Sequence, residues 1–370
     1  MRSYLSRFFL LPAAALFILS AASHATAGPI SDVQNNVKNA SDISEPTATA
    51  GPDTAAGESN AKTGQVFTAV PKSSGRNSRV EETPYNRLQF KFAHNSYERN
   101  ETIPEMLEFN DRFKFQAGCR GVEFDCHQDS GRTGEKDAWR WSVHHDGEYS
   151  AEKPQLELYL AQLRSWSERN PGHDPIAVYV EFKDADGNDE IFAKKFDEII
   201  LKKLAGNKRE KLFTPADMMA RAGGSAKSLA AAAQKAGWPV IRELRGKFIV
   251  VITGGDGERK EFYSRDPEKR LAFADRDCGE GDVKKIPSIE SGNRIFLNIH
   301  VYHKNKGWHE FCRKAASYKA FVVRGWKVNA PPLWSDCVKY GMNMLATDKV
   351  KNHPWAYIGG GTGVFRVIGD

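Results

Sequence analysis

Short apolar runs alternate with amphipathic helical stretches along the chain, and this alternation limits its fold more than any other feature. Residues 176–182 and 247–252 are almost continuously apolar, as strands covered on both faces are. Strands that alternate with helices form parallel βα units. Eight such runs predict a closed (β/α)8 TIM barrel, irregular in its second half, where residues 253–293 form a long connection. The runs are residues 88–92, 121–125, 141–145, 176–182, 247–252, 295–299, 321–323 and 344–347.

Local signals place helices between these runs. Thr102 followed by Glu105 has the form of a capping box, and Thr214 followed by Pro215 has the form of a helix start. Large apolar residues recur at a helical period over residues 156–166 and 192–200. We therefore expect helices that begin near residues 103 and 215 and helices that span the two periodic stretches.

Ionisable and amide side chains stand at the carboxyl ends of the first four runs. Barrel enzymes carry their chemistry at this end of the strands, so these side chains predict one functional site at one rim. Four neighbouring strands that all end in such groups are not expected by chance. The side chains are His94, Asn95, Glu123, Asp125, His144, His145 and Glu181.

The residue types at this rim predict metal-assisted chemistry. Glu123 and Asp125 are two residues apart in a strand, so their side chains share one face. Like charges this close repel each other unless a cation or a shared proton lies between them. Carboxylate and amide oxygens suit calcium or magnesium, and flanking histidines can transfer protons near neutral pH. The combination points to reaction at a phosphate ester.

The first 82 residues differ in composition from the rest. A basic start, an apolar run over residues 8–22 and an Ala-Thr-Ala site before Gly28 predict a secretory signal peptide over residues 1–27. Small and polar residues dominate residues 28–82, which we expect to be a disordered low-complexity linker. Residues 83–370 are then one barrel domain. We expect an exported protein, periplasmic or secreted, with no transmembrane segment in the mature chain.

Net charge and cysteine content add weaker limits. The formal charge of +6 is ordinary for a soluble protein; it also suits anionic headgroups, and nothing specifically indicates nucleic acid. Five cysteines in an exported chain permit disulfides and leave at least one unpaired. Cys278, Cys312 and Cys337 make a C-terminal pair reasonable, whereas Cys119 and Cys126 read as small packing residues.

Four motifs together resemble the calcium-dependent phosphatidylinositol-specific phospholipases C, most closely their bacterial secreted branch. The similarity spans about residues 85–255, with weaker support from Leu-Ala-Thr-Asp at residues 345–348. The motifs are Ala-His-Asn-Ser-Tyr (93–97), Gly-Cys-Arg-Gly-Val-Glu-Phe-Asp (118–125), Val-His-His-Asp-Gly (143–147) and Val-Tyr-Val-Glu-Phe-Lys-Asp (178–184).

The resemblance implies a two-stage reaction with one calcium ion. His94 would take the proton from the inositol 2-hydroxyl, which attacks its own phosphate and expels diacylglycerol. A histidine of the third motif would protonate the leaving oxygen. The implied calcium ligands are Asn95, Glu123, Asp125 and Glu181.

The identity of the second histidine stays open. The family pattern is an apolar residue, a variable residue, then His and Gly, whereas this chain has Val143-His144-His145-Asp146. That alignment selects His145 and leaves His144 as the alternate. The substitution at residue 146 and the long gap after Asp125 affect the expected substrate more than the reaction class.

Three cations are candidates for contacts with the substrate. Lys183 shares a strand face with Glu181, so it could bind the phosphate or form a salt bridge to that carboxylate. Arg324 and Lys327 follow the seventh run and are candidate headgroup contacts.

Three rival functions remain. A glycerophosphodiester phosphodiesterase is also a barrel with a Glu-x-Asp motif, and Asp146 favours it, but the His-Asn-Ser-Tyr motif does not fit it. Metal-free bacterial phospholipases carry an arginine where Asp125 stands. A non-catalytic lipid- or inositol-binding barrel would not need two acid–base histidines. The substrate is accordingly a phospholipid headgroup at a membrane surface or a soluble phosphodiester.

Overall fold

The computed structural model describes residues 78–109, 117–129, 139–183, 190–254, 258–358 and 363–370. The predicted signal peptide lies outside these residues, as does all of the predicted linker except its last five residues. Those five belong to the folded part: α1 (Ser78–Glu81) begins it, and Glu81 pairs with Arg245. The domain thus begins slightly before the predicted residue 83.

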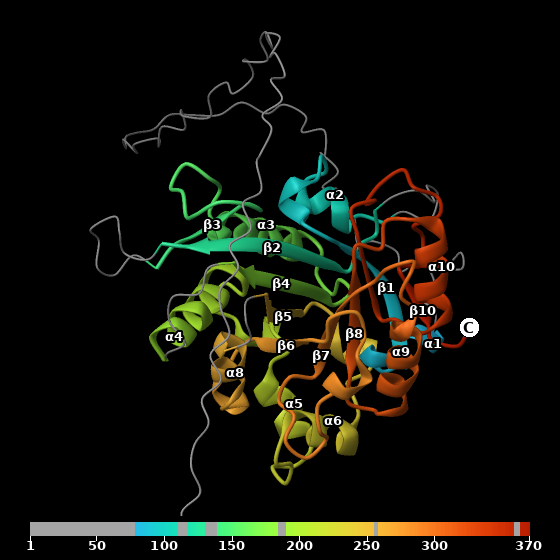
Figure 1. Cartoon of the computed structure of the whole chain (residues 1–370). Helices are drawn as coiled ribbons and strands as arrows, with labels where there is room; N and C mark the ends of the chain where they lie inside the picture. Colours follow the sequence, from blue (N-terminus) through green and yellow to red (C-terminus); the bar gives the residue numbers. More distant parts are fainter. Residues whose placement is uncertain (1–77, 110–116, 130–138, 184–189, 255–257, 359–362) are drawn as a thin grey trace, which may run out of the picture. The chain divides into compact units, whose positions relative to one another are not determined.

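Eight parallel strands close into a barrel (Figure 1). The order around the barrel is β1, β2, β4, β5, β6, β7, β8 and β9, and pairing of β9 with β1 completes the circle. The predicted fold class is confirmed. The strands are β1 (Leu88–Ala93), β2 (Gly121–Gln128), β4 (Ile176–Phe182), β5 (Phe248–Thr253), β6 (Phe273–Asp277), β7 (Phe296–His300), β8 (Val322–Trp326) and β9 (Met344–Thr347).

The run at residues 141–145 is not a barrel strand, which corrects the prediction. Only β3 (Trp141–Val143) is extended, and it pairs antiparallel with the last three residues of β2. The barrel neighbour of β2 is β4, in register from Gly121 opposite Ala177. β3 is apolar because its side chains pack against β4 and α4 and not because it forms part of the barrel wall: Trp141 contacts Phe182 and Phe196.

The barrel strand that the prediction missed is β6. Its sequence, Phe-Ala-Asp-Arg-Asp, is too polar to be recognised as a buried strand. Asp275 is nevertheless fully buried, because the Lys260 ammonium lies 2.7 Å from its Oδ1 and the Thr253 hydroxyl donates to its Oδ2. β6 can therefore be buried without an apolar sequence pattern, because residues of other elements neutralise its polar side chain.

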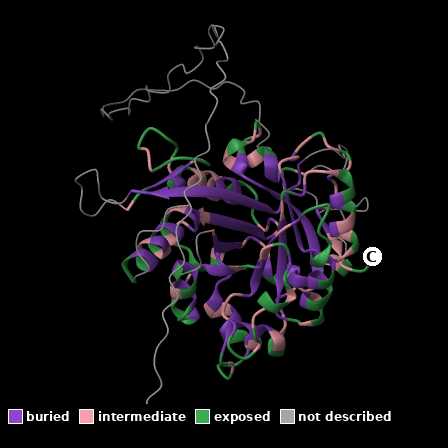
Figure 2. Cartoon of the chain, in the orientation of Figure 1, coloured by how far each residue is buried: buried purple, intermediate pink, exposed green. Residues whose placement is uncertain are grey.

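Helices cover the outside of the barrel, and the strands between them are buried (Figure 2). The predicted helix starts are confirmed: Thr102 with Glu105 and Thr214 with Asp217 both form complete capping boxes. Beyond α1, the helices are α2 (Ile103–Leu107), α3 (Leu156–Arg169), α4 (Glu190–Ile199), α5 (Pro215–Arg221), α6 (Leu229–Ala236), α7 (Ile241–Leu244), α8 (Glu258–Ser264), α9 (Gly307–Ser317) and α10 (Pro331–Lys339). A further strand, β10 (Phe365–Val367), pairs antiparallel with the start of β1.

Side chains of β2 and β4 alternate between the barrel interior and the helices. Val122 and Phe124 belong to the core beneath α3 and α4, while Tyr179 packs inside the barrel edge-on to Phe92 at 5.2 Å between ring centroids. Gly121 allows this packing, because a Cβ there would lie 2.0 Å from the Phe92 ring. The alternation that the sequence predicts for Glu123 and Asp125 is therefore present.

Two further expectations concern thiols and membranes. All five cysteines are free and buried, so the expected C-terminal disulfide is wrong. Cys278 instead donates from Sγ to backbone carbonyls of Arg276 and Lys285. Among the described residues, no helix combines the length and the apolar character that a bilayer span requires.

Candidate active site

One cavity of about 340 Å³ opens at the carboxyl ends of the barrel strands. It brings together every site residue that the sequence predicted except the alternate His144. The predicted residues that line it are His94, Asn95, Glu123, Asp125, His145, Glu181, Lys183, Arg324 and Lys327.

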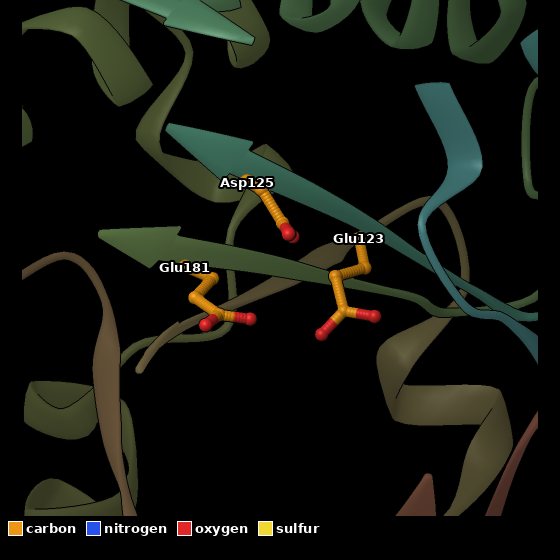
Figure 3. A group of neighbouring side chains, drawn as sticks. All are labelled: Glu123, Asp125 and Glu181. Atoms are coloured by element: carbon orange, nitrogen blue, oxygen red, sulfur yellow. The ribbon is translucent and has the colours of Figure 1, made fainter. Parts of the chain in front are cut away.

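Three carboxylates converge in this cavity (Figure 3). Glu123 and Asp125 point from one face of β2, and Glu181 on β4 stands directly opposite Asp125 in the strand register. One oxygen atom of each lies within 4.8 Å of the others. Gly254 makes room for this arrangement, because a Cβ there would lie 2.3 Å from Glu181 Cγ.

Asp125 is buried with little compensation for its charge. Neither of its carboxylate oxygens has a well-formed hydrogen bond, and the Lys183 ammonium lies 2.9 Å from Oδ2 as an ion contact. Burial raises the pKa of Asp125 to about 6, and the charges of Glu181 and Glu123 add to this rise. Lys183 opposes the rise only in part.

Lys183 bridges two of the carboxylates. Its ammonium lies 2.9 Å from Glu181 Oε1 as well as from Asp125. Burial alone would lower the pKa of Lys183, but the two carboxylates hold it above its usual value. Of the two roles that the sequence left open, the salt bridge to Glu181 is therefore present.

Glu123 has a stronger partner. The Arg324 guanidinium lies 2.6 Å from Glu123 Oε2, and both side chains are 2 % exposed. Burial would raise the pKa of Glu123, but Arg324 and then His94 hold it below its usual range. Arg324 also lies 4.8 Å above the rings of Phe92 and Tyr179. It is thus a buried counter-ion inside the barrel rather than a cation free for a headgroup.

Asn95 lies directly beside Glu123. Its backbone has a φ of 44°, a left-handed conformation that asparagine tolerates better than most residues. In this turn its backbone N–H donates to Glu123 Oε2 at 3.3 Å. Its side-chain amide nitrogen donates to Glu98 at 3.2 Å. The turn therefore brings the fourth predicted ligand to the carboxylates.

The donor set fits a hard divalent cation. Three carboxylates within reach of one atom, with an amide beside them, match the oxygen ligands of calcium or magnesium. The buried Asp125 oxygens that lack hydrogen bonds support this fit. The Lys183 ammonium provides positive charge between two of the three acids, Asp125 and Glu181.

His94 is held by an aspartate to which the sequence assigned no role. Its Nδ1 lies 2.7 Å from Asp348 Oδ1, and its Nε2 is directed toward the cavity, 4.0 Å from Glu123 Oε2. Asp348 follows β9 directly, and its backbone N–H donates to Asn329 Oδ1. Burial would raise the pKa of Asp348, but the hydrogen bond and charge of His94 hold it below its usual range. An acidic residue directly after a barrel strand is the signal that could have identified it.

The two histidines after β3 lie in different environments. His145 lines the cavity, is 47 % exposed and has its Nδ1 2.8 Å from Asp146 Oδ1. His144 does not line it; its two ring nitrogens lie within hydrogen-bond distance of the Ser142 hydroxyl and the Asp146 carbonyl. Its ring stacks on His127 at 4.2 Å. The geometry therefore favours His145 over the alternate.

Other lining residues come from elements beyond the predicted motifs. Lys260 enters from α8 and is neutralised by Asp275 beneath it. Trp326, at the end of β8, stacks on His94 at 6.0 Å. Lys327 is exposed at the rim, with its ammonium 5.1 Å from the Trp326 ring. The second half of the barrel thus supplies aromatic and cationic groups to a site whose three clustered carboxylates come from the first half.

Comparison with known proteins agrees with this geometry. Residues 142–290 match the family "Phosphoinositide phospholipase C, Ca2+-dependent". A calcium-dependent phosphoinositol-specific phospholipase C from a Pseudomonas species has a similar structure, with a TM-score of 0.60 and 22 % identity over 78 % of this chain and 96 % of that one. Its myoinositol complex gives the same TM-score at 21 % identity, over 79 % and 97 % of the two chains.

A more distant bacterial structure extends the agreement. A calcium-dependent phosphatidylinositol-specific phospholipase C from Streptomyces antibioticus has a TM-score of 0.52 at 16 % identity, over 72 % of this chain and 95 % of that one. No curated protein sequence matches significantly. At these identities the structures establish the fold, and the family match covers the segment that carries His145 and Glu181. The resemblance seen in the motifs is thereby confirmed: residues 142–290 match the calcium-dependent phosphoinositide phospholipases C, and the chain has the barrel fold of bacterial phospholipases C of this kind.

Proposed function

We propose that this protein is a calcium-dependent phosphodiesterase of the phospholipase C type that cleaves phosphatidylinositol-like substrates through an inositol cyclic phosphate. One observation carries the proposal: three carboxylates within 4.8 Å of each other share a cavity with two histidines on separate segments. A structural cluster of acids does not need such flanking histidines. An acid–base reaction at a phosphate does.

Asn95, Glu123, Asp125 and Glu181 would hold one calcium ion. When bound, the ion would lower the pKa of a coordinated hydroxyl and neutralise charge on the phosphoryl oxygens. The raised pKa of Asp125 supports this assignment, because burial and the neighbouring charges of Glu181 and Glu123 outweigh the effect of Lys183. The proposed ligands lie on β1, β2 and β4 or directly after them, so the barrel wall holds them in place.

His94 would act as the general base. In the neutral tautomer in which Nδ1–H donates to the Asp348 carboxylate, Nε2 would be the free acceptor at the cavity. Nε2 would then take the proton from the inositol 2-hydroxyl, which attacks its own phosphorus. Because nucleophile and phosphate belong to one molecule, correct orientation supplies most of the advantage.

His145 would act as the general acid. It would donate its proton to the diacylglycerol oxygen as the bond from phosphorus to that oxygen breaks. The contact of its Nδ1 with Asp146 Oδ1 at 2.8 Å would leave Nε2 to face the leaving group. The exposure of His145 at the cavity mouth suits a leaving group that remains in a membrane surface.

Lys183 and Lys327 are the cations we assign to the substrate. Lys183 lies at the carboxylates, next to the expected position of the phosphate. Lys327 at the rim is exposed and has no ion pair in the described part of the chain. Arg324, the third predicted contact, would act indirectly by holding Glu123.

Export remains part of the proposal. The basic and apolar start of the chain and the Ala-Thr-Ala site predict removal of residues 1–27. Mass spectrometry of protein recovered from periplasm and culture medium tests this. A chain found only in the cytoplasm with Met1 intact would contradict it.

The decisive experiment compares products with and without calcium. The purified protein is incubated with phosphatidylinositol vesicles in calcium or in excess chelator, and ³¹P NMR follows inositol cyclic phosphate. We expect product only with calcium. Turnover that survives the chelator would refute the metal assignment. Hydrolysis of glycerophosphodiesters without phosphatidylinositol cleavage would favour the glycerophosphodiesterase, and headgroup binding without turnover would favour a non-catalytic barrel.

A further inference from the structure

A second cavity, of about 550 Å³, lies on the other side of β6 from the active site. Successive residues of a strand face opposite sides, and here Asp277 lines the active-site cavity while Arg276 lines the second one. The other walls come from the end of α8 and from residues 284–294, which lead into β7. In Figure 1, α8 lies beside β6 on the outside of the barrel. The catalytic proposal does not use this cavity.

The lining of this second cavity carries an excess of positive charge. Arg265, Arg276, Lys284 and Arg294 face a single carboxylate, that of Glu261. Glu261 is already paired with Arg294 at 3.0 Å. Arg265 lies over the Phe262 ring at 5.4 Å. In the described part of the chain it forms no ion pair with an acid. The cavity therefore has three more cationic groups than acidic groups.

Arg276 is the most informative of these groups. It is half-buried, and in the part of the chain that the structure describes its guanidinium makes no hydrogen bond or ion pair. A guanidinium without an acidic partner keeps its N–H donors available to an anion that enters the cavity. Burial lowers the pKa of Arg294; the charge of Glu261 opposes this and the charge of Arg276 adds to it, so the two guanidinium groups that line the cavity repel each other.

The chemistry of the lining defines what would relieve this repulsion. Guanidinium groups present planar pairs of N–H donors that match phosphate oxygens. Ser288 and Ser291 line the same space, and their hydroxyls are additional donors, whereas the Ser264 hydroxyl donates to the Glu261 carbonyl. Few apolar side chains line it, so an acyl chain does not fit. The ligand must be a compact, multiply charged oxyanion.

We propose that this cavity is a second binding site, distinct from the active site, for a phosphate group. The phosphate belongs either to a small solute or to the headgroup of an anionic lipid. In the second case the site would hold the enzyme on a charged membrane, because it lies at the same end of β6 as the active-site cavity. The same cationic side chains would bind the phosphate of a solute and that of a lipid headgroup. Separate binding measurements with inorganic phosphate and with vesicles distinguish the two.

The test uses the full chain without calcium and two variants of the cavity. Arg276→Gln removes the unpartnered guanidinium, and Lys284→Gln removes an exposed cation without risk to the fold. Arg169→Gln, at the exposed last residue of α3, is the matched control for the loss of one positive charge. Binding of inorganic phosphate is measured by titration calorimetry. Binding to phosphatidylcholine vesicles with and without phosphatidylglycerol is measured by sedimentation.

We expect Arg276→Gln to weaken one phosphate-binding event on the order of ten-fold, with a smaller loss for Lys284→Gln and none for the control. If phosphate binding alone falls, the natural ligand is a soluble phosphate. If binding to phosphatidylglycerol vesicles falls as well, it is a lipid headgroup. Phosphate and vesicle binding that are the same in the wild type, both cavity variants and the control would overturn the proposal.

Discussion

Each end of the barrel withdraws an aspartate from solvent, but the surroundings shift the pKa of the two carboxyl groups in opposite directions. Asp174, at the amino-terminal end, lies 2.7 Å from Arg120 and also contacts Arg245. Burial would raise the pKa of Asp174, but these two guanidinium groups hold it below its usual range. At the other end, burial and neighbouring acids raise the pKa of Asp125 to about 6.

The difference lies in counter-charge rather than in burial. At the amino-terminal end, Asp174 and Glu81 are paired with Arg120 and Arg245, so two acids meet two arginines. Arg120 also donates to two backbone carbonyls. At the carboxyl end, three carboxylates share Lys183 and Arg324. A buried charge cluster that is balanced stabilises the fold, whereas one with excess charge of one sign is ready to bind a ligand. Substitutions at the two ends should therefore affect different measurements.

The largest effect is expected for His94→Ala. Loss of the proposed base should lower kcat/KM by about 10²- to 10⁴-fold, the usual contribution of a general base. The melting temperature should change little, because the imidazole is held mainly by one hydrogen bond to Asp348. Turnover of phosphatidylinositol and thermal unfolding check both statements. Full activity in this variant would eliminate the proposed role.

The adjacent histidines provide a matched pair of similar size. His145→Ala should lose about 10²- to 10⁴-fold in kcat as the proposed acid disappears. His144→Ala should keep kcat within a few-fold and lose about 1 kcal/mol of stability with its hydrogen bonds. Measurements of kcat and of chemical denaturation for both variants identify which histidine is the general acid. The reverse pattern would show that the alternate is the acid.

At the opposite end, Asp174→Asn should lower stability instead of activity. Removing the charge that Arg120 and Arg245 share leaves Arg120 without an acidic partner and Arg245 with Glu81 alone, which should cost about 3 kcal/mol of unfolding free energy. Below the melting temperature, kcat should be unchanged. Glu82→Gln is the control, since its pair with Arg242 is exposed and should contribute less than about 1 kcal/mol. A loss of kcat in folded Asp174→Asn would break the contrast between the two ends.

His173, next to Asp174, predicts a pH effect at the same end. Burial lowers the pKa of His173 to about 4, so the folded protein holds it neutral while the unfolded chain binds a proton below about pH 6.5. Its contribution to stability is full above that pH and falls as the pH drops toward 4, by at most about 3 kcal/mol. Denaturation of the wild type and His173→Gln between pH 4 and 7 isolates this contribution. Parallel curves for the two proteins would contradict it.

The smallest effect is expected for Asp348→Asn. The variant keeps the size of the side chain but weakens its hold on the His94 ring, so a loss on the order of 10- to 100-fold in kcat is expected. The pH profile distinguishes positioning from structure: the apparent pKa of the essential base should fall when the carboxylate is gone. An unchanged profile together with lower stability would assign Asp348 a purely structural role.

Particular residues explain which parts of the fold and the site could be predicted. Glu123, Asp125 and Glu181 stand near the ends of apolar strands, where alternation alone sets their direction, and all three line the cavity as predicted. β6 was not recognised because Asp275 is neutralised by Lys260, which comes from another element. The pattern of residues 141–145 wrongly predicts a barrel strand, because an apolar strand that pairs with the end of β2 has the same local pattern as one in the barrel wall.

The spacing of residue types along the sequence was enough to determine the barrel class, the helix caps at Thr102 and Thr214 and the strand faces that carry the acids. These depend on backbone periods and on contacts a few residues apart, which sequence spacing reports directly. Only the tertiary structure decided that Asp348 holds His94, that Arg324 neutralises Glu123 and that β3 lies outside the barrel. Each of these depends on which distant segments meet at the closed barrel, because pair energies between charges depend on distance in space and not along the chain.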